Sequence, residues 1–396
     1  MIGNVVQYLP CTASPPKLFK HPKPFRHKKT IYTNFKRKME NKGLLFIPDI
    51  SGFTRFVTET EIEHSRYIIQ DLLEILINAN QVGLEISEIE GDAILFYKFG
   101  APLQLEAIYK QVERMFCEFH RHLIAYEYRR LCQCKACVSA VSLSLKVITH
   151  YGEFTSYNVK NFSKLIGKDI IVAHQLLKND IEQHEYWLVT DSLLPGAPPT
   201  GLAEWMQWSQ SAKQTETGSI PFHYTQLSYL KDQIPPDYPA SPELAQQVKT
   251  VAVSKVYHTN IKNLFYTACH PEFRHRWQKG IKAVHDVDHK LPGIGNRYRY
   301  ELEKGERMVY VSSFAYNPDE SIVLTETDAN KKSSLHFFME KMDEHTTRFT
   351  LSYYIRKDPL SRLLFTLSKK ARLEKDLQAS LAALEPLLQE IEVPPF

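Results

Sequence analysis

The sequence predicts an α+β protein with two domains. Strands and helices follow a βαββαβ order in the first half of the chain, which predicts helices on one face of a mostly antiparallel sheet. Alternating strands followed by one long helix fill the last third, and the proline-rich stretch 233–247 separates the two patterns as a linker. A chain of 396 residues is also too long for one ordinary hydrophobic core.

The composition is that of a soluble globular protein, with 43% apolar and 24% charged residues. No apolar run reaches the roughly 18 residues that a membrane-spanning helix requires, and we expect a cytoplasmic chain. Residues 1–38 hold nine Lys or Arg and no acid, which leaves 40 basic and 45 acidic residues, or −5, elsewhere. We therefore expect a disordered basic tail, or an over-called start upstream of Met39, and no nucleic-acid binding.

The elements of the first domain are predicted from apolar periodicity and turn residues. GLLFIPDI, residues 43–50, predicts a buried strand, and residues 61–80 predict a helix with one apolar face. The acidic turn Glu90-Gly91-Asp92 divides residues 84–99 into a hairpin. The remaining predicted elements are a helix at about 102–130, a strand at 141–154, a loop leading into a helix at 160–180 and a strand at 185–194.

Four segments resemble the class III nucleotidyl cyclase homology domain in order and approximate spacing: FIPDISGFT, IEGDAILFY, VITHYGEF and IGKDIIVAHQLL. The resemblance covers about residues 43–232 and implies a cyclase-like α/β sandwich with a ferredoxin-like core, acting as a homodimer. It also implies that Asp49 and Asp92 hold Mg or Mn, a role that suits carboxylate oxygens. The alternative is that Asp49 caps a turn and Asp92 completes the hairpin.

The same resemblance implies that the segment after the first acid binds a nucleoside triphosphate, through Ser51, Gly52, Phe53 and Thr54. Glycine has no Cβ, so main-chain N–H groups at such a position can approach phosphate oxygens closely. Glu88 and Lys164 match the positions that select the base in that family, although Lys164 differs from both known forms. A solvated loop lysine is the simpler interpretation of Lys164.

Two departures from the family pattern predict impaired catalysis. In the family, a helix supplies an Asn that orients the ribose and an Arg that stabilises charge on the phosphate. This chain has Ile171 and Gln175 at the matching positions, and neutral Gln cannot replace the bidentate guanidinium of Arg. His150, in THYGEF, matches a position that is usually structural, and we assign it no chemistry.

Three of the six cysteines are clustered as Cys132, Cys134 and Cys137 in RLCQCKAC. Three soft ligands within six residues suit Zn²⁺, but a structural zinc site needs a fourth ligand. Cys117 lies fifteen residues earlier, roughly 22 Å along an unbroken helix, and His120 and His122 have the same difficulty. Free or redox-active thiols are the alternative, and disulfides are not expected in a cytosolic chain.

The second domain, residues 248–391, resembles the helix-grip fold of START-like and polyketide-cyclase-like proteins in its layout alone. Strands alternate in segments such as TTRFTLSYYI, and a helix from about Pro359 to Ile391 carries a stripe of Leu377, Leu381, Leu384 and Leu388. The resemblance implies a cavity for a hydrophobic small molecule. Its predicted lining is Trp277, Tyr298, Tyr300 and Phe349, although these side chains could equally fill a core.

The sequence therefore predicts a nucleotide-linked signalling or sensor protein with an impaired cyclase-homology domain and a ligand-binding helix-grip domain. Two alternatives stay open: an active metal-dependent cyclase with rearranged catalytic residues, and a small-molecule carrier that uses the cyclase fold for dimerisation. The pair Ile171 and Gln175 argues against turnover but not against binding.

Overall fold

The computed structural model describes residues 41–194, 199–215, 218–235, 246–288, 293–358 and 369–393. The basic tail at 1–38, most of the predicted linker and the predicted helical residues 359–368 lie outside these ranges. The described residues form two compact units, one from within 1–124 and 139–236 and the other from within 125–138 and 237–396. Among the described helices, none is both long and apolar enough to cross a bilayer.

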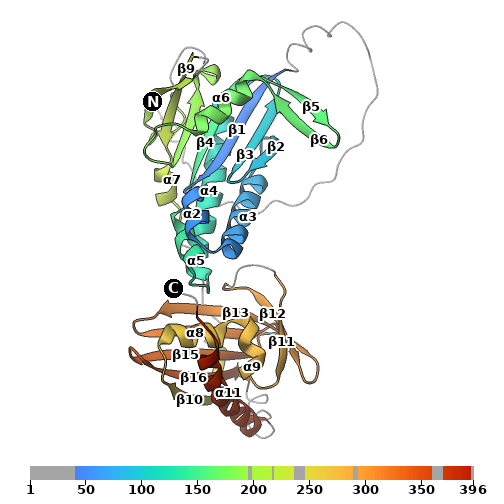
Figure 1. Cartoon of the computed structure of the whole chain (residues 1–396), viewed down its shortest axis with the longest axis vertical. Coiled ribbons are helices and arrows are strands. Elements are labelled where there is room, and N and C mark those ends of the chain that lie inside the picture. The colour runs from blue at the N-terminus through green and yellow to red at the C-terminus, as the bar shows by residue number, and fades with distance from the viewer. Residues whose placement is uncertain are drawn as a thin grey trace, which may run out of the picture. The chain divides into compact units, whose positions relative to one another are not determined.

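The first unit is built on a seven-stranded sheet with the order β2-β3-β1-β4-β7-β9-β8 (Figure 1). Within it β4 and β7 pair in parallel, and the other described neighbours pair antiparallel. The order β2-β3-β1-β4, with a helix after β1 and another after β3, is the ferredoxin-like arrangement, so the predicted α+β class is confirmed. The strands are β1 (Lys42–Ser51), β2 (Glu85–Glu90), β3 (Ala93–Phe99), β4 (Ser144–Glu153), β7 (Tyr186–Thr190), β8 (Trp208–Thr215) and β9 (Gly218–Gln226).

Both faces of the central strand β1 are covered, because nine consecutive residues of it are buried. Leu45 and Ile47 share a core cluster with Ile170 and Ala173 of α6. The expectation that helices cover one face alone is therefore wrong. A short apolar run such as that of β1 is typical of a strand buried on both sides. The helices assigned in residues 41–235 are α2 (Phe53–Glu59), α3 (Ile62–Asn78), α4 (Leu105–Arg129), α5 (Lys135–Ser139), α6 (Lys168–Leu177) and α7 (Ser228–Asp232).

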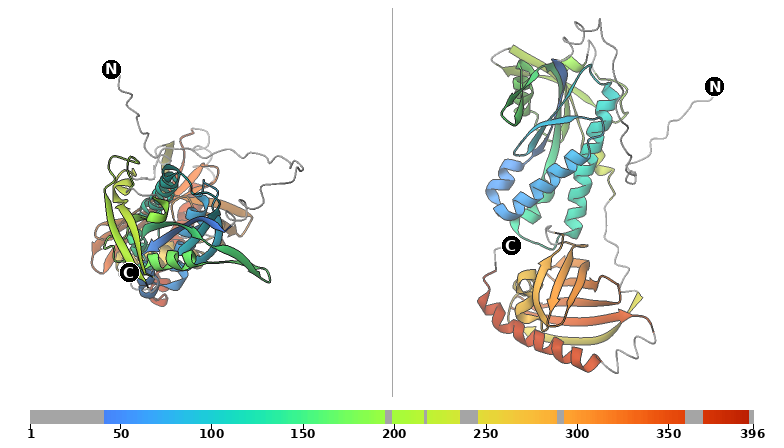
Figure 2. Two further views of the ribbon diagram at one scale, coloured as in Figure 1. Left: turned by 90° about the horizontal axis from the view of Figure 1, so that it is seen from above. Right: turned by 90° about the vertical axis from the view of Figure 1, so that its right-hand side faces the viewer.

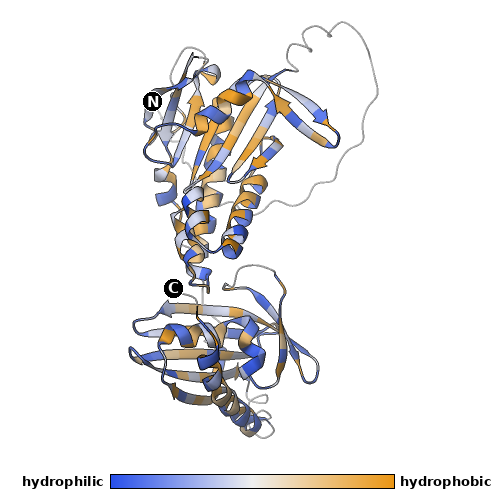
Figure 3. Ribbon diagram, viewed as in Figure 1, coloured by the Kyte–Doolittle hydropathy of each residue, from blue (hydrophilic) through white to orange (hydrophobic). Residues whose placement is uncertain are grey.

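The predicted loop before α6 is wrong, because a hairpin of β5 (Thr155–Val159) and β6 (Phe162–Ile166) precedes that helix. Apart from Leu165, which is partly buried, its apolar side chains stay exposed, so no fully buried face produces the alternation by which strands are recognised. Figure 3 shows apolar residues concentrated instead along β1, β3 and β4. The sequence also did not predict α2, β8 and β9.

The second unit is a seven-stranded antiparallel sheet in the order β10-β16-β15-β14-β13-β12-β11, with helices packed against it. Figure 2 shows α11 lying along this sheet. The helices that we describe in this unit are α8 (Ile261–Cys269), α9 (Arg274–Trp277) and α11 (Lys370–Glu390). The strands are β10 (Gln247–Tyr257), β11 (Ile281–Asp286), β12 (Arg297–Leu302), β13 (Glu306–Asn317), β14 (Ser321–Asp328), β15 (Ser333–Asp343) and β16 (Thr346–Arg356).

The apolar stripe of α11 packs into the core of this sheet. Leu377, Leu381 and Leu384 are buried as predicted, whereas Leu387 is more deeply buried than the predicted Leu388. Helices repeat every 3.6 residues, so neighbouring positions such as 387 and 388 both border the buried stripe. The result is a sheet with a long helix at its end, as the alternation and the leucine spacing predict.

Candidate functional site

The candidate site of the first unit lies where β1 ends beside the β2–β3 turn. Asp49 is paired with Ala93 across the β1–β3 ladder, and the N–H of Ile50 donates a 3.0 Å hydrogen bond to the main-chain oxygen of Asp92. Gly91 completes the turn with a φ of 64°, a conformation that side chains with a Cβ rarely adopt. The strand pairing therefore brings the two predicted metal-binding acids together.

Burial dominates the electrostatics of Asp49, which is 8% exposed. The pKa of Asp49 is raised from 3.8 to about 6, because loss of solvent and, to a smaller extent, the nearby Asp92 carboxylate outweigh the opposing charge of Lys146. Burial also raises the pKa of Asp92, although its own backbone N–H and Lys146 oppose this change. The negative charge of the pair is thus only partly balanced within the unit.

Lys146 supplies that partial balance, and the sequence did not identify it. It lies opposite Asp49 in the β1–β4 register, and its Nζ is 3.5 Å from Asp49 Oδ1 and 3.3 Å from the main-chain oxygen of Leu177. Only the β1–β4 register reveals this pairing, because the two residues are almost a hundred positions apart. Two carboxylates with raised pKa values beside a single ammonium fit an additional hard cation.

The segment after Asp49 offers further polar groups. Ser51 is 7% exposed, and its buried Oγ has no hydrogen-bond partner among the described residues. Gly52 has a φ of 89°, which a residue with a Cβ would adopt only with strain. Thr54 is exposed at the start of α2. An unpartnered buried hydroxyl is costly, so Ser51 is the residue here that most needs an external partner.

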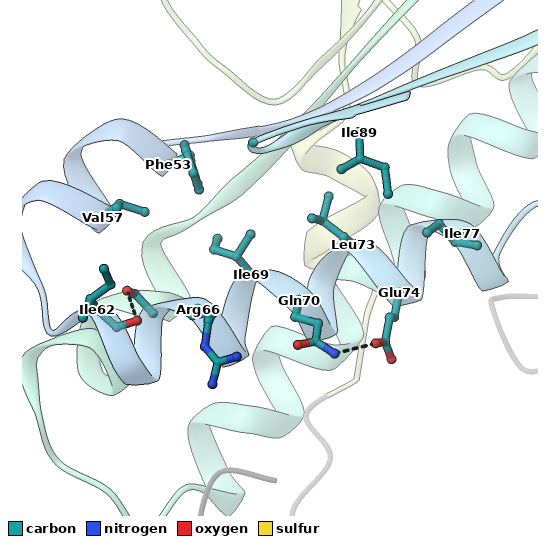
Figure 4. Close-up of a pocket in the computed structure, with 12 residues that line it drawn as sticks. Phe53, Val57, Ile62, Arg66, Ile69, Gln70, Leu73, Glu74, Ile77 and Ile89 are labelled. Carbon is teal, nitrogen blue, oxygen red and sulfur yellow. Dashed lines mark hydrogen bonds between the residues drawn. The ribbon is translucent and has the colours of Figure 1, made fainter. Parts of the chain in front are cut away.

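The side chain of Phe53 belongs to an apolar groove of about 480 Å³ between α2, α3 and the β2–β3 turn. Figure 4 shows Phe53, Val57, Leu73 and Ile89 pointing toward this groove. A Cβ added at Gly91 would lie 3.5 Å from the Phe53 ring, so the ring covers the turn that carries Asp92. Phe53 therefore contributes packing beside the acids, and any contact of this residue with a phosphate would come from its main chain.

The two predicted base-selecting residues form an ion pair with each other. Lys164 Nζ of β6 donates to Glu88 Oε2 of β2, and this bond raises the pKa of Lys164. Glu88, Glu90 and His174 also have possible ligand atoms within 4.8 Å of one another. The sequence matched both residues to base-selecting positions, with a solvated loop lysine as the alternative for Lys164, and the structure pairs them with each other in one charged cluster.

The two departures on α6 lie four residues apart and so share one face of the helix. Ile171 is 60% exposed, and the buried Oε1 of Gln175 has no hydrogen-bond partner among the described residues. An exposed isoleucine offers no hydrogen bond to a ribose. Neither residue places a positive charge on this face.

His150 is held between two partners in the core of the first unit. Its Nδ1 is 2.8 Å from Thr190 Oγ1 and its Nε2 is 3.1 Å from Asp169 Oδ1. The N–H of Glu153 also donates to Asp169, at 2.6 Å. A Cβ on Gly152 would lie 2.2 Å from Asp169, so the glycine of THYGEF is required by this packing. The geometry agrees with the structural role expected for His150.

The three clustered cysteines meet in the second unit. Their Sγ atoms lie within 4.8 Å of one another, and the N–H of Cys137 points to Cys134 Sγ at a distance of 3.5 Å. Hydrogen bonding to Cys132 and Cys134 raises the pKa of the buried Cys137 thiol. Thiolates packed this closely would repel one another, and a cation among them would relieve that repulsion.

The predicted cavity residues of the second unit are all buried, but they have different surroundings. Tyr300 lines a cavity of about 220 Å³. Trp277 and Phe349 pack on each other with ring centroids 6.2 Å apart, as core residues do. The sequence missed Arg274 and Glu326, which form a buried ion pair at 2.6 Å. Single charged residues in a strand and a short helix give no periodic signal.

Comparisons with known proteins find similarity to parts of this chain. Residues 69–186 match a family described as a protein of unknown function, DUF2652. A segment of 120 residues is 32% identical to an uncharacterised protein of Mycobacterium tuberculosis (strain ATCC 25618 / H37Rv), covering 30% of this chain and 56% of that protein. The chain thus spans about half the length of this relative.

Several solved structures with some similarity are catalytic domains of cyclases. The match to the catalytic core of a rhodopsin-guanylyl cyclase covers 47% of this chain and 96% of the cyclase core. The two are 16% identical, and the TM-score is 0.35. The match to the guanylate cyclase domain from Catenaria anguillulae, solved with GTP, covers 47% of this chain and 97% of that domain, at 15% identity and a TM-score of 0.32. The match to a bacterial light-regulated adenylyl cyclase covers 49% of this chain and 55% of that protein, at 15% identity and a TM-score of 0.34. The fold assignment rests on the strand order of the chain itself.

Proposed function

We propose that the first unit binds a nucleoside triphosphate together with a divalent cation and does not convert it to a 3′,5′-cyclic product. The observation that carries this proposal is the buried pair of Asp49 and Asp92, whose raised pKa values indicate incompletely balanced negative charge. A nucleotide-related signalling role agrees with the cyclase-like arrangement of the sheet. The function proposed is that of a sensor that responds to binding.

The residues of this chain would act in binding as follows. Asp49 and Asp92 would hold Mg²⁺ or Mn²⁺, which supplies positive charge for the phosphate oxygens. Ser51 Oγ, buried without a partner among the described residues, would donate to a phosphate oxygen. Gly52 would allow the main chain to approach it. Lys146 remains as a fixed positive charge beside the acids.

Turnover is not expected, because the two matching positions of α6, Ile171 and Gln175, carry no charged group that stabilises charge developing on the phosphate. Removing one such donor typically costs an enzyme about 2.7–4 kcal/mol of barrier. The face of α6 with Ile171 and Gln175 has neither the ribose-orienting amide nor the cationic fork that the family uses. Binding contacts act on the ground state and the transition state alike, so they survive this loss.

The experiment is a thermal shift of the full chain with each of ATP, GTP, CTP and UTP, in Mg²⁺ or Mn²⁺. We expect at least one triphosphate to raise the melting temperature, because a ligand that binds only the folded chain stabilises it. Asp49→Asn should abolish this shift, whereas Asp180→Asn, at an exposed acid of the same unit, should not change it. An unchanged melting curve with all four nucleotides at millimolar concentration would assign the acids a structural role.

We also propose that Cys132, Cys134 and Cys137 bind Zn²⁺. Three sulfur atoms within 4.8 Å of one another are close enough that small side-chain movements would place all three at the usual Zn–S distance of about 2.3 Å from one ion. The N–H of Cys137, directed at Cys134 Sγ, would stabilise a metal-bound thiolate.

Elemental analysis of the purified full chain should find close to one zinc per chain. Cys137→Ser should lose it, whereas Cys269→Ala, at another buried cysteine of the second unit, should retain it. Wild-type protein without metal, with all three thiols rapidly titrated, would contradict the assignment.

A homodimer is proposed from the exposed apolar side chains of the β5–β6 hairpin and α6. Phe162 is 72% exposed, Ile171 60% and Ile166 57%. Large exposed apolar side chains are typical of an interface, and the family resemblance selects a second copy of the chain as the partner. Light scattering should give the mass of a dimer, and Phe162→Ser should shift it toward the monomer. A wild-type monomer at high micromolar concentration would contradict the proposal.

For the second unit we propose a START-like helix-grip fold that binds a small molecule between its sheet and its last helix. Residues of both elements, among them Leu335 of β15 and Leu377 of α11, line the same cavity. This proposal is independent of the nucleotide site.

A further inference from the structure

The apolar groove of about 480 Å³ between α2, α3 and the β2–β3 turn is open to solvent along its wall (Figure 4). Ile62 and Ile89, which line it, are 78% and 48% exposed. Phe53 of α2 and Leu73 of α3 extend the same apolar surface. A continuous apolar surface of this kind is typical of a docking site for another segment of protein.

The part of the chain that builds this groove is strongly acidic. Residues 53–92 hold nine Asp or Glu and two Arg, with no Lys, which gives a formal charge of −7. The two charged residues on the groove wall, Arg66 and Glu74, balance each other, so the excess belongs to the surroundings of the groove. Lys146 and Lys164 lie beside acids of this region and offset only part of its charge.

This charge decides between the possible occupants of the groove. A second copy of the chain that placed the same face here would bring another set of acidic residues, and like charges repel. Nucleic acids and the anionic lipids of a membrane surface are negatively charged as well. The occupant that fits is a peptide segment with apolar side chains among Lys and Arg, because it matches both the groove and its surroundings.

The chain itself carries such a segment before β1. Residues 17–29, KLFKHPKPFRHKK, hold six Lys or Arg and no acid, with Phe19 and Phe25 among them. These two phenylalanines are six residues apart, which is about 20 Å at full extension. Along α3 the groove runs from Ile62 to Ile77, about 22 Å at a rise of 1.5 Å per residue. Both rings can therefore contact the groove at the same time.

The length of chain before β1 permits this contact. The ten residues of β1, from Lys42 onward, cover about 33 Å before the chain reaches Phe53 in the groove. Phe25 precedes Lys42 by seventeen residues, a reach of up to about 60 Å. Phe35 precedes it by seven residues, and its reach of up to about 25 Å is too short. A tethered segment acts at an effective concentration of about millimolar, so weak contacts are sufficient.

We propose that residues 17–29 dock in this groove of the same chain, with Phe19 and Phe25 on its apolar wall. The Lys and Arg side chains of the segment then lie beside the acidic residues around the groove. Because the Phe53 ring covers the turn that carries Asp92, the docked segment adjoins the proposed nucleotide site. The inference does not depend on nucleotide binding.

Hydrogen exchange of the full chain at low salt, followed by mass spectrometry, tests the contact. In the double variant Phe19→Ser with Phe25→Ser, peptides of α2 and of the first turns of α3 should exchange about tenfold faster than in wild type. This change is expected when a docked state that outnumbers the undocked state about tenfold is lost. Phe35→Ser should exchange like wild type, because this residue cannot reach Phe53. None of these substitutions alters a side chain of the described core.

A matched pair of isoleucines on β2 tests the groove itself. Ile89 lines the groove, whereas Ile86 is 42% exposed on the same strand and is not among the lining residues. In an Ile89→Ser background, the two tail substitutions should have no further effect on exchange, because the contact is already lost. In an Ile86→Ser background they should keep their tenfold effect.

Three results would overturn the proposal. The first is equal exchange of wild type and the double tail variant. The second is protection of α2 that weakens on dilution, which would assign the groove to another copy of the chain. The third is a tail effect of the same size in the Ile89→Ser and Ile86→Ser backgrounds, which would place the contact outside the groove. High salt should reduce the tenfold difference, and a difference that salt leaves unchanged would contradict the role of charge in selecting the segment.

Discussion

Replacing Asp49 by asparagine should make the ligand-free first unit more stable. Burial is the main cause that raises the pKa of this carboxyl from 3.8 to about 6. Near pH 7 the carboxyl is ionised, and keeping this charge in the folded chain lowers the free energy of unfolding. Each pKa unit corresponds to about 1.4 kcal/mol, and a shift of about two units therefore corresponds to about 3 kcal/mol. Asparagine resembles the protonated acid in size and polarity and avoids this cost.

The effect has a defined pH dependence. A carboxyl whose pKa is raised in the folded state favours folding while it is protonated, so the wild-type chain loses stability as the pH rises from about 4 through about 6. The asparagine variant does not titrate at this position. Its advantage should therefore be small near pH 4, grow across this interval and stay constant above pH 7.

Hydrogen exchange followed by mass spectrometry is a suitable assay, because it reports the opening of single elements in a chain of two units. Peptides from β1 and β4 should exchange up to about 100-fold more slowly in the variant at pH 7.5, the rate equivalent of about 3 kcal/mol. Asp180→Asn serves as the control, since Asp180 is exposed. Mg²⁺ with a triphosphate should then protect β1 in the wild type and not in Asp49→Asn.

Exchange of Asp49→Asn as fast as wild type, or faster, at pH 7.5 would contradict this prediction. That result would show that the ion pair of Asp49 with Lys146, 3.5 Å apart, compensates the burial completely. Asp49 would then be a structural residue, and the proposed cation would lose its main attraction.

Three further predictions test other parts of the first unit. Lys146→Met should increase the affinity for Mn²⁺, measured by calorimetry, because the ammonium competes with a metal ion for the acids; a decrease would mean that the lysine organises the site. Gly152→Ala should destabilise this unit by about 1–3 kcal/mol in thermal melts, since its Cβ would lie 2.2 Å from Asp169, and an unchanged melting temperature would contradict that packing. Gln175→Arg alone should yield no cyclic nucleotide by mass spectrometry with Mn²⁺ and any of the four triphosphates, because Ile171 still cannot orient the ribose; detected product that depends on Mn²⁺ would refute this.

The sequence predicted elements with a buried apolar face and missed those without one. The residues of α3 and of β16 follow helical and alternating periods, and both elements form where the sequence places them. The β5–β6 hairpin exposes nearly all of its side chains, so its strands carry no such period. Helix α2, from Phe53 to Glu59, is too short to show a helical repeat of apolar residues.

The sequence predicted the acidic residues of the candidate site but not the basic residue beside them. Motif order suggested Asp49 and Asp92, whereas Lys146 becomes their neighbour only through the register of β1 with β4. In the second unit, Arg274 and Glu326 come from a helix and a strand that are 52 positions apart. Long-range pairings of charged residues leave no local pattern, so sequence periodicity cannot reveal them.

The distribution of charge in the first unit separates binding from catalysis. The acids and the unpartnered Ser51 hydroxyl belong to β1 and the β2–β3 turn, and in the proposed function they would act on a bound triphosphate whether or not its bonds are changing. The groups that would act only in a transition state belong on α6, where Ile171 is 60% exposed and Gln175 is uncharged. Selection for nucleotide binding alone would preserve the first set and leave the second free to change. A substitution that restores charge to α6 would therefore affect turnover without improving affinity, whereas a change at Asp49 would affect affinity first.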